Sequence, residues 1–221
     1  MKLNTRIMIA LALVATPAWA EEKKADVVWK RLFDGKTLDG WKPSFTDFTG
    51  KVDVKDGAIV LQKGMKMTGV TYAGKDFPKS DYEVVLEGKR IEGKDFFCTT
   101  TFPVGDAFCS LVVGGWGGML TGISSINGAD ASENETTSST EFKDNTWYKV
   151  RIRVSEKKVE AWIGEEKVAD VERKGRKFTT RLECEDCQPF GLATYDTVGA
   201  VREIMLRTLT EAEKKAVEPK K

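Results

Sequence analysis

The side chains that could do chemistry in this chain are limited by its composition, because its 221 residues include no histidine. Without an imidazole, a Ser-His-Asp triad, a histidine-ligated zinc ion and a histidine acid–base step are all excluded. Catalytic proton transfer must therefore use Asp, Glu, Tyr, Lys or Arg, and a catalytic metal must be held by oxygen atoms.

The densest group of oxygen-bearing side chains is N-G-A-D-A-S-E-N-E-T-T, residues 127–137. Glu133 or Glu135 is the predicted base, partly buried and with a raised pKa, and Asp130 would orient it. Asn134 is a predicted partner for sugar hydroxyl groups. The segment lacks the residue order of an EF-hand, but a calcium site and a solvated surface loop remain alternatives.

Trp116 lies between two pairs of glycines in G-G-W-G-G, residues 114–118. The indole either is exposed, where the apolar face of a sugar can stack on it, or packs against backbone at a bulge in a sheet. A strand predicted over residues 119–126, about 25 Å long at roughly 3.3 Å per residue, separates Trp116 from residues 127–137. The two would meet only if the chain bends at its glycines or the loop folds over the sheet.

Three further polar side chains are candidate substrate-binding residues. Arg181 and Glu183 alternate, with Glu185, on one face of a predicted strand, and Tyr195 belongs to the next strand. Alternating charges are typical of the solvated face of a strand, and the same face could also form a binding surface.

The four cysteines are Cys98, Cys109, Cys184 and Cys187. Cys98 and Cys109 flank F-P-V-G-D, residues 102–106, and a hairpin turn there predicts a disulfide between them. Cys184 and Cys187 could pair only if the chain turns between them, because side chains three apart on a strand face opposite ways. A four-cysteine zinc site and a redox motif are weaker alternatives, since there is one C-x-x-C and no βαβ pattern around it.

Strands must position these side chains, because apolar and polar residues alternate along most of the chain. In residues 147–154 every second residue is apolar, which is typical of a half-buried strand, and residues 159–163 and 168–171 complete a meander. About a dozen short strands with turn residues between them indicate a single all-β sandwich or barrel. The other predicted strands cover residues 57–62, 81–90, 96–102, 108–113, 120–126, 190–195 and 201–209.

Residues 1–20 have the pattern of a secretory signal peptide. Lys2 and Arg6 precede an apolar run over residues 7–15, which is about half the roughly 20 residues that a spanning helix needs. In A-W-A, residues 18–20, the small residues at the −3 and −1 positions predict cleavage after Ala20. The protein is therefore expected to be exported, periplasmic or extracellular.

The remaining chain divides into a charged lead-in at residues 21–27, one domain at residues 28–209 and a charged tail at residues 210–221, which is expected to be helical or disordered. The whole chain has 35 basic and 34 acidic residues, so no general attraction to nucleic acid or to an anionic membrane is expected. No segment after residue 20 is apolar enough to span a bilayer. A polar or neutral ligand is the expected partner.

Three segments together resemble the 3-keto-disaccharide hydrolase domain family, over residues 28–209. They are F-D-G-K-T-L-D-G-W at residues 33–41, W-Y-K-V-R-I-R-V at 147–154, and F-G-L-A-T-Y-D-T with V-R-E-I-M-L-R-T-L between residues 190 and 209. The middle of the chain resembles an exported bacterial branch of that family. The resemblance implies a concanavalin A-like jelly-roll β-sandwich.

The resemblance also implies action on glycosides that carry a ketone at C3. The ketone acidifies the C2 proton, so a base can remove it, the C1–O bond breaks by β-elimination, and water adds to the enone. Such a site needs a base, an acid for the leaving oxygen and a cation or donor group for the enolate. An oxygen-ligated divalent metal is left open.

A non-catalytic carbohydrate-binding or surface-interaction module is the alternative function, since a fold by itself does not give activity. Two carboxylates in a cleft beside an exposed aromatic side chain would favour the enzyme. A shallow face with aromatic side chains and no carboxylates would favour the binding module.

Overall fold

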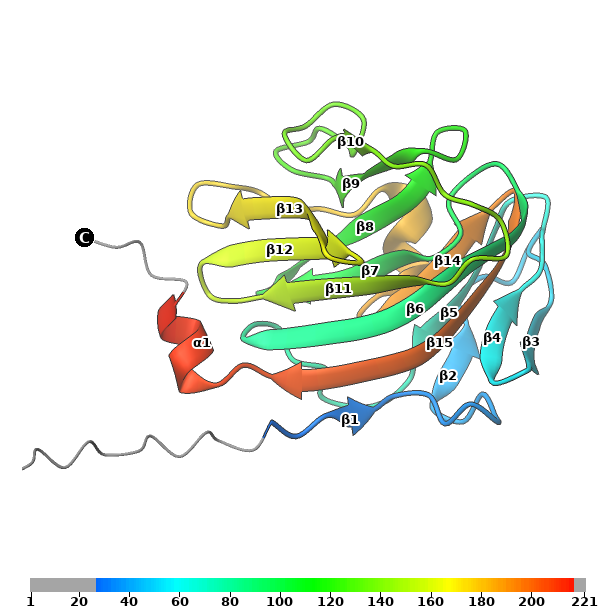
Figure 1. Cartoon of the computed structure of the whole chain (residues 1–221), viewed down its shortest axis with the longest axis horizontal. Helices are drawn as coiled ribbons and strands as arrows, with labels where there is room; N and C mark the ends of the chain where they lie inside the picture. The colour runs from blue at the N-terminus through cyan, green and yellow to red at the C-terminus, as the bar shows by residue number, and fades with distance from the viewer. Residues whose placement is uncertain (1–26, 217–221) are drawn as a thin grey trace, which may run out of the picture.

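The computed structural model describes residues 27–216, which form two antiparallel sheets packed face to face (Figure 1). The all-β, jelly-roll sandwich expected from the sequence is confirmed. The predicted signal peptide and its cleavage site lie outside the described residues. Within residues 27–216, the helical segments lack the length and apolar character that crossing a membrane requires.

Sheet A has eight strands, and β11, β6 and β15 lie side by side in Figure 1. The opening strand β1 pairs with the closing strand β15, with Lys30 opposite Leu206. The order across sheet A is β13 (Glu166–Glu172), β12 (Lys158–Ile163), β11 (Tyr148–Val154), β6 (Tyr82–Gly93), β15 (Thr197–Thr208), β4 (Ala58–Leu61) and β3 (Val52–Lys55), with β1 (Lys30–Arg31) beside β15.

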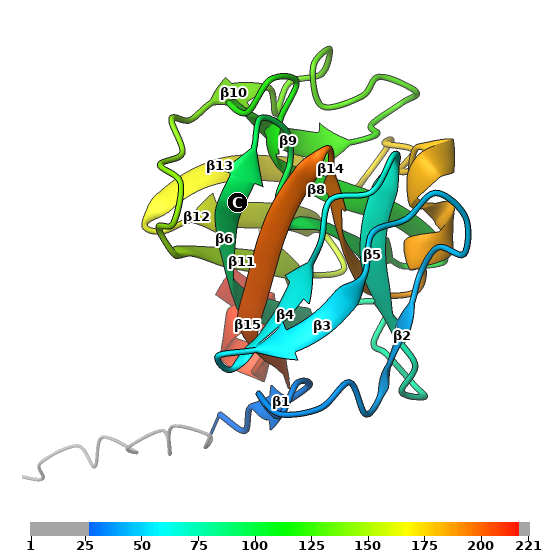
Figure 2. The ribbon, with the colours of Figure 1, turned by 90° about the vertical axis from the view of Figure 1, so that its right-hand side faces the viewer.

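Sheet B has seven strands, and its centre joins segments that are far apart in sequence. The order is β10 (Ser138–Ser139), β9 (Leu120–Ser124), β8 (Ala107–Gly115), β7 (Thr99–Val104), β14 (Gly191–Tyr195), β5 (Met67–Tyr72) and β2 (Trp41–Pro43). A 3-10 helix, η1 (Leu182–Cys187), packs against β5 and β14 and is the gold coil in Figure 2.

The core lies between the two sheets because every second residue of their strands is apolar and faces inward. Leu86 and Ile152 of sheet A and Leu111 and Leu192 of sheet B are buried in one cluster. Burying apolar surface contributes about 25 cal/mol per Å², which makes this cluster the main source of stability. Trp41 from the opening motif joins it, and its indole nitrogen donates to the Leu32 carbonyl at 2.9 Å.

The residues of sheet B that point away from the core are mostly small or polar. Register places Thr101 opposite Ser110, and Ser110 opposite Ser124, so these three share the outer face. Thr99 and Val112 lie on the same face, because each is two residues along its strand from Thr101 or Ser110. Met67 also lies there, because it is two residues from Gly69, and Ala193 pairs with both Gly69 and Thr99. This outer face forms the floor of the candidate site.

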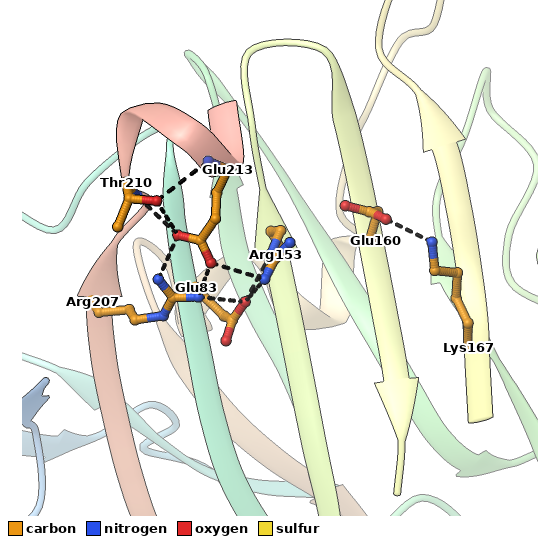
Figure 3. A network of polar contacts seen from close by, with 7 residues as sticks. All are labelled: Glu83, Arg153, Glu160, Lys167, Arg207, Thr210 and Glu213. Atoms are coloured by element: carbon orange, nitrogen blue, oxygen red, sulfur yellow. Dashed lines mark hydrogen bonds and ion pairs between the residues drawn. The ribbon is translucent and has the colours of Figure 1, made fainter. Parts of the chain in front are cut away.

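After β15 the chain forms α1 (Glu211–Ala216), and an ionic network holds this helix to the outer face of sheet A (Figure 3). The Glu213 carboxylate accepts hydrogen bonds from Arg207 at 2.6 and 2.7 Å and lies 3.4 Å from Arg153. Thr210 and Glu213 also bond reciprocally, as in a helix capping box. The buried Glu83 carboxylate accepts from the same two arginines. The tail expected to be helical or disordered is thus helical over α1.

The predicted disulfide between Cys98 and Cys109 is wrong, although the hairpin that carries them is present. The turn is at Gly105–Asp106, so Val104 pairs with Ala107 and Phe102 pairs with Cys109. Cys98 is four residues before Phe102, which places it about 13 Å along the strand from the partner of Cys109. All four cysteines of the chain are free and buried.

Candidate functional site

A cleft of about 680 Å³ lies on the outer face of sheet B. This volume is within the usual range for small-ligand sites. Its floor consists of outward-facing side chains of β5, β7, β8 and β9: Met67, Thr99, Ser110, Val112 and Ser124.

The walls come mostly from segments that connect strands, and the sheet holds these segments in place. Their lining residues are Phe45 and Asp47 after β2, Lys66 before β5, Asp95 and Phe96 between β6 and β7, Trp116 between β8 and β9, and Arg181, Leu182, Glu183, Cys184 and Asp186 in and beside η1, with Tyr195 at the end of β14.

Two aromatic rings present their surfaces at this cleft. Trp116 is 44% exposed and Tyr195 is 45% exposed. Trp116 lies in the glycine turn between β8 and β9, with a φ of 47° that is unusual for a residue with a side chain, and its exposure excludes a buried crossing. The Tyr195 ring lies 5.9 Å from the ring of Phe96, which limits its movement. Exposed aromatic faces of this kind suit the apolar face of a sugar.

Arg181 links Trp116 to residues 127–137, the polar loop. Its guanidinium lies 5.7 Å from the Trp116 ring and forms ion pairs with Asp130 at 2.8 Å and Glu183 at 3.3 Å. The hydrogen bond from Arg181 holds the pKa of Glu183 below its ordinary value. Burial raises the pKa of Asp130, but hydrogen bonds from Ser132 and Arg181 outweigh this and lower it. Both carboxylates therefore stay ionised.

Asp95 differs from these carboxylates because its pKa is raised. Burial is the main cause, the nearby Asp196 carboxylate adds to it, and backbone amides, foremost that of Phe96, partly offset it. The Phe96 amide donates to Asp95 Oδ1 at 2.8 Å, and the Asp95 amide donates to the Thr197 hydroxyl at 3.0 Å. The backbone of Asp95 is thus held by β15 while its side chain lines the cleft, which suits a base.

The structure places Glu133 and Glu135 outside this cleft. Both are exposed, so their predicted burial is wrong, and Glu135 pairs with Arg176. Asn134 serves the loop itself: its amide nitrogen donates to the carbonyls of Ile123 and Asp130, each at 2.7 Å. Among the polar-loop residues predicted to act, Asp130 alone contacts a residue of the cleft, through Arg181.

The predicted strand that carries Arg181, Glu183 and Glu185 is wrong, because the chain forms η1 there. A 3-10 helix repeats every three residues, so Cys184 and Cys187 both turn inward while the charged residues point outward. The turn that their pairing would require is present, and in the structure both are free thiols.

The described residues contain no cluster of three acidic or cysteine side chains that could hold a metal ion. Asp47, Asp95, Glu183 and Asp186 all line the cleft without forming such a cluster.

Sequence reasoning missed Asp95 and Phe96. They lie in G-K-D-F-F, residues 93–97, where the strand predicted over residues 96–102 begins, and an acidic residue beside aromatic ones was the available signal. Phe45, Lys66 and Asp186 also line the cleft, and no sequence pattern singles them out.

Comparison with known proteins agrees with this fold. The profile of the 3-keto-alpha-glucoside-1,2-lyase-like domain matches residues 28–207. No curated protein sequence matches the chain.

Three solved structures share the fold. The carbohydrate-binding module CBM66 from Bacillus subtilis is 12% identical, with a TM-score of 0.51 over 76% of this chain and 96% of its own. The laminarinase from Flavobacterium sp. UMI-01 is 12% identical, with a TM-score of 0.51 over 83% and 100%. The Crh5 transglycosylase in complex with NAG is 11% identical, with a TM-score of 0.55 over 85% of each chain.

Proposed function

Because the chain belongs to the 3-keto-disaccharide hydrolase (3-keto-alpha-glucoside-1,2-lyase-like) domain family, we propose that it cleaves glycosides oxidised to a ketone at C3, in the cleft on sheet B. The observation that carries the proposal is that one cleft combines two exposed aromatic rings, a carboxylate with a raised pKa and an arginine. Aromatic rings bind the sugar, and the charged groups supply what an elimination needs.

In the proposed elimination Asp95 removes the C2 proton. The electron pair of the C2–H bond forms the C1=C2 double bond, the C1–O bond breaks, and the Tyr195 hydroxyl protonates the leaving oxygen. A raised pKa makes Asp95 a stronger base than an exposed aspartate. Arg181 provides the positive charge that stabilises the enolate oxygen at C3.

Water then adds to C1 of the enone and the two side chains return to their starting states. The Tyr195 phenolate takes a proton from the water, and protonated Asp95 returns a proton to C2. Backbone contact supports the pairing of these two groups, because the Tyr195 amide donates to the carbonyl of Phe96 at 3.2 Å, next to Asp95. No outside oxidant or reductant is needed for the cycle.

The second candidate function is sugar binding without turnover. It is supported by the exposure of Trp116 and Tyr195 and by the likeness of the fold to CBM66. The carboxylates at the cleft favour the enzyme over the module, because stacking alone does not need them.

The proposal is tested with the purified protein and a 3-keto-glucoside, following the loss of the ketone-sugar absorbance. Asp95→Asn is expected to lower kcat by at least about 100-fold, the usual worth of a general base, with the melting temperature retained. Asp56→Asn, in the turn between β3 and β4 of sheet A, is the matched control and should keep full activity.

Two outcomes would contradict the proposal. Full activity in Asp95→Asn, with loss in Glu133→Gln/Glu135→Gln, would move the site to the polar loop. Quenching of tryptophan fluorescence by the 3-keto-glucoside without turnover would establish the binding module instead.

A further inference from the structure

A second cleft, of about 800 Å³, shares no lining residue with the first. It is formed by the ends of the β7–β8 hairpin, by the turn between β11 and β12, and by the segment that follows β13. We propose that this cleft binds the acidic groups of an anionic polysaccharide, either sulfate esters or uronates. This goes beyond the proposed cleavage of neutral 3-keto-glycosides.

The cleft is basic although the protein is nearly neutral. Its basic lining residues are Lys157, Arg173, Lys174, Arg176 and Lys177, and its acidic ones are Glu156 and Glu172. Four of the basic residues come from one run, R-K-G-R-K, at residues 173–177. The net charge of the whole chain is only +1, so the concentration of charge here is local. Runs of this kind are typical of sites for polyanions.

Much of this positive charge is not neutralised by the protein itself. Glu172 lies 3.2 Å from Lys158, which is outside the cleft lining. In the described part of the chain, neither Lys174 nor Lys177 takes part in an ion pair. The cleft therefore offers cations to an anionic ligand.

Arg173 is fixed in place by neutral partners, so its charge also remains available. Its Nη1 donates to the Ser80 hydroxyl at 2.8 Å and to the Ser155 carbonyl at 2.5 Å. A guanidinium held in this way is preorganised for a sulfate or carboxylate group. Arg176 pairs with Glu135 of the polar loop, which forms a charged rim beside the cleft.

A polysaccharide fits this cleft better than a nucleic acid. Phe178 is the aromatic residue of its lining and is 6% exposed, so no ring is offered for stacking of bases. The same segment of chain then continues to the first cleft. The backbones of Thr179 and of Ser125, which follows β9, bond to each other, and Arg181 lines the first cleft. Arg181 lies eight positions after Arg173, a span of at most about 29 Å.

The test measures binding of dextran sulfate, polygalacturonate, neutral dextran and an oligo-thymidine DNA to the full protein by calorimetry at two salt concentrations. Wild type should bind at least one of the two anionic polysaccharides, more weakly at higher salt, and should not bind dextran. Lys174→Glu/Lys177→Glu should weaken binding by about 10-fold or more. The matched control Lys36→Glu/Lys75→Glu, which makes the same change in charge away from both clefts, should weaken it by less than about 2-fold.

The polysaccharide that binds identifies the acidic group, since dextran sulfate carries sulfate and polygalacturonate carries carboxylate. Equal loss in the two double variants would overturn the proposal, because the effect would then come from net charge. DNA binding as tight as that of the polysaccharides would also overturn it. Activity on a 3-keto-glucoside provides an independent readout, and Lys174→Glu/Lys177→Glu should leave it unchanged.

Discussion

Asp95 and Tyr195 come from distant parts of the sequence and meet because β7 pairs with β14. Asp95 lies outside the three segments that resemble the family, whereas Tyr195 lies in one of them, and the chemistry proposed for them depends on that pairing. The raised pKa of Asp95 is equally a product of its surroundings, since it arises from burial and from the Asp196 carboxylate. At the residue scale, the useful variants are therefore those that change the surroundings of Asp95 and leave its side chain in place.

Asp196→Asn is such a variant. As a base Asp95 must be ionised, so activity is lost when the pH falls below its pKa. Removing the Asp196 charge lowers that pKa and also frees Lys63, which pairs with Asp196 at 2.5 Å. The acidic limb of the profile of kcat/KM against pH should therefore move to lower pH.

The measurement is kcat/KM for a 3-keto-glucoside across the acidic range. Asp53→Asn removes a carboxylate that also pairs with a lysine, Lys51, on sheet A, and should leave the limb in place. A limb that does not move in Asp196→Asn, or that moves to higher pH, would mean that another group titrates.

Part of the candidate site could be predicted from residue types. Trp116, Arg181, Glu183 and Tyr195 were singled out from glycine spacing and from alternation, and all four line the cleft. Glu133 and Glu135 were preferred because acidic residues are dense there. Density in sequence does not report burial, and both side chains point to solvent.

At the element scale, the two short helices are held by different forces. η1 is anchored by the buried Cys184 and Cys187 against Met67 and Ala193. α1 is anchored by charge, through Glu213 (Figure 3). Hydrogen bonds from Arg207 are the main cause that lowers the pKa of Glu213 from 4.5 to about 2.

The stability that Glu213 contributes should therefore depend on pH. A carboxyl group whose pKa is lowered on folding stabilises the protein fully above its unfolded value of 4.5, and this contribution is lost as the pH falls towards about 2. Glu213→Gln should lower the free energy of unfolding by about 2 kcal/mol at pH 7, the usual worth of charged hydrogen bonds. Near pH 2.5 the difference in stability between the variant and the wild type should be much smaller than at pH 7.

Urea unfolding at the two pH values measures this difference. Glu211→Gln is the control, because Glu211 is largely exposed and bonds within α1 to Lys214 alone among the described residues. It should leave the unfolding midpoint unchanged. A Glu213→Gln effect of equal size at both pH values would show that packing, and not ionisation, anchors α1.

Two elements that the sequence did not predict, β5 and η1, were missed for identifiable physical reasons. β5 was missed because M-T-G-V-T-Y is interrupted by Gly69. That glycine is required, since a Cβ there would lie 2.8 Å from the Leu192 carbonyl oxygen. η1 was mistaken for a strand because its charges alternate, whereas the three-residue spacing of the two cysteines was the better indicator.

At the scale of the whole molecule, the sandwich could be predicted but the position of the cleft could not. Strands and turns are local patterns, and their number indicates a sandwich. The floor of the cleft depends on which face of sheet B lies outward across β5, β14, β7, β8 and β9, and this is set by pairings between distant segments. The disulfide prediction failed for a local reason: the turn lies at Gly105–Asp106, so Cys109 pairs with Phe102, which is four residues after Cys98.

The molecule therefore derives its stability from its core without a covalent cross-link in the described residues. Burial raises the pKa of all four thiols, that of Cys187 to about 12. We expect a thiol reagent to label the folded protein very slowly at pH 8 and all four cysteines after unfolding. We also expect a reductant to leave the melting temperature unchanged. Fewer than four reactive thiols in the unfolded, unreduced protein, or a lower melting temperature with reductant, would mean that a disulfide is present.

The pairing of β1 with β15 has a consequence for the connectivity of the fold. The first and last strands of the described chain are neighbours in sheet A, with Lys30 opposite Leu206, whereas both clefts are built by other segments. A short peptide could therefore join these ends, and the chain could be opened at the β12–β13 turn without interrupting a wall of either cleft. We therefore expect a circular permutant opened at the β12–β13 turn to keep both clefts.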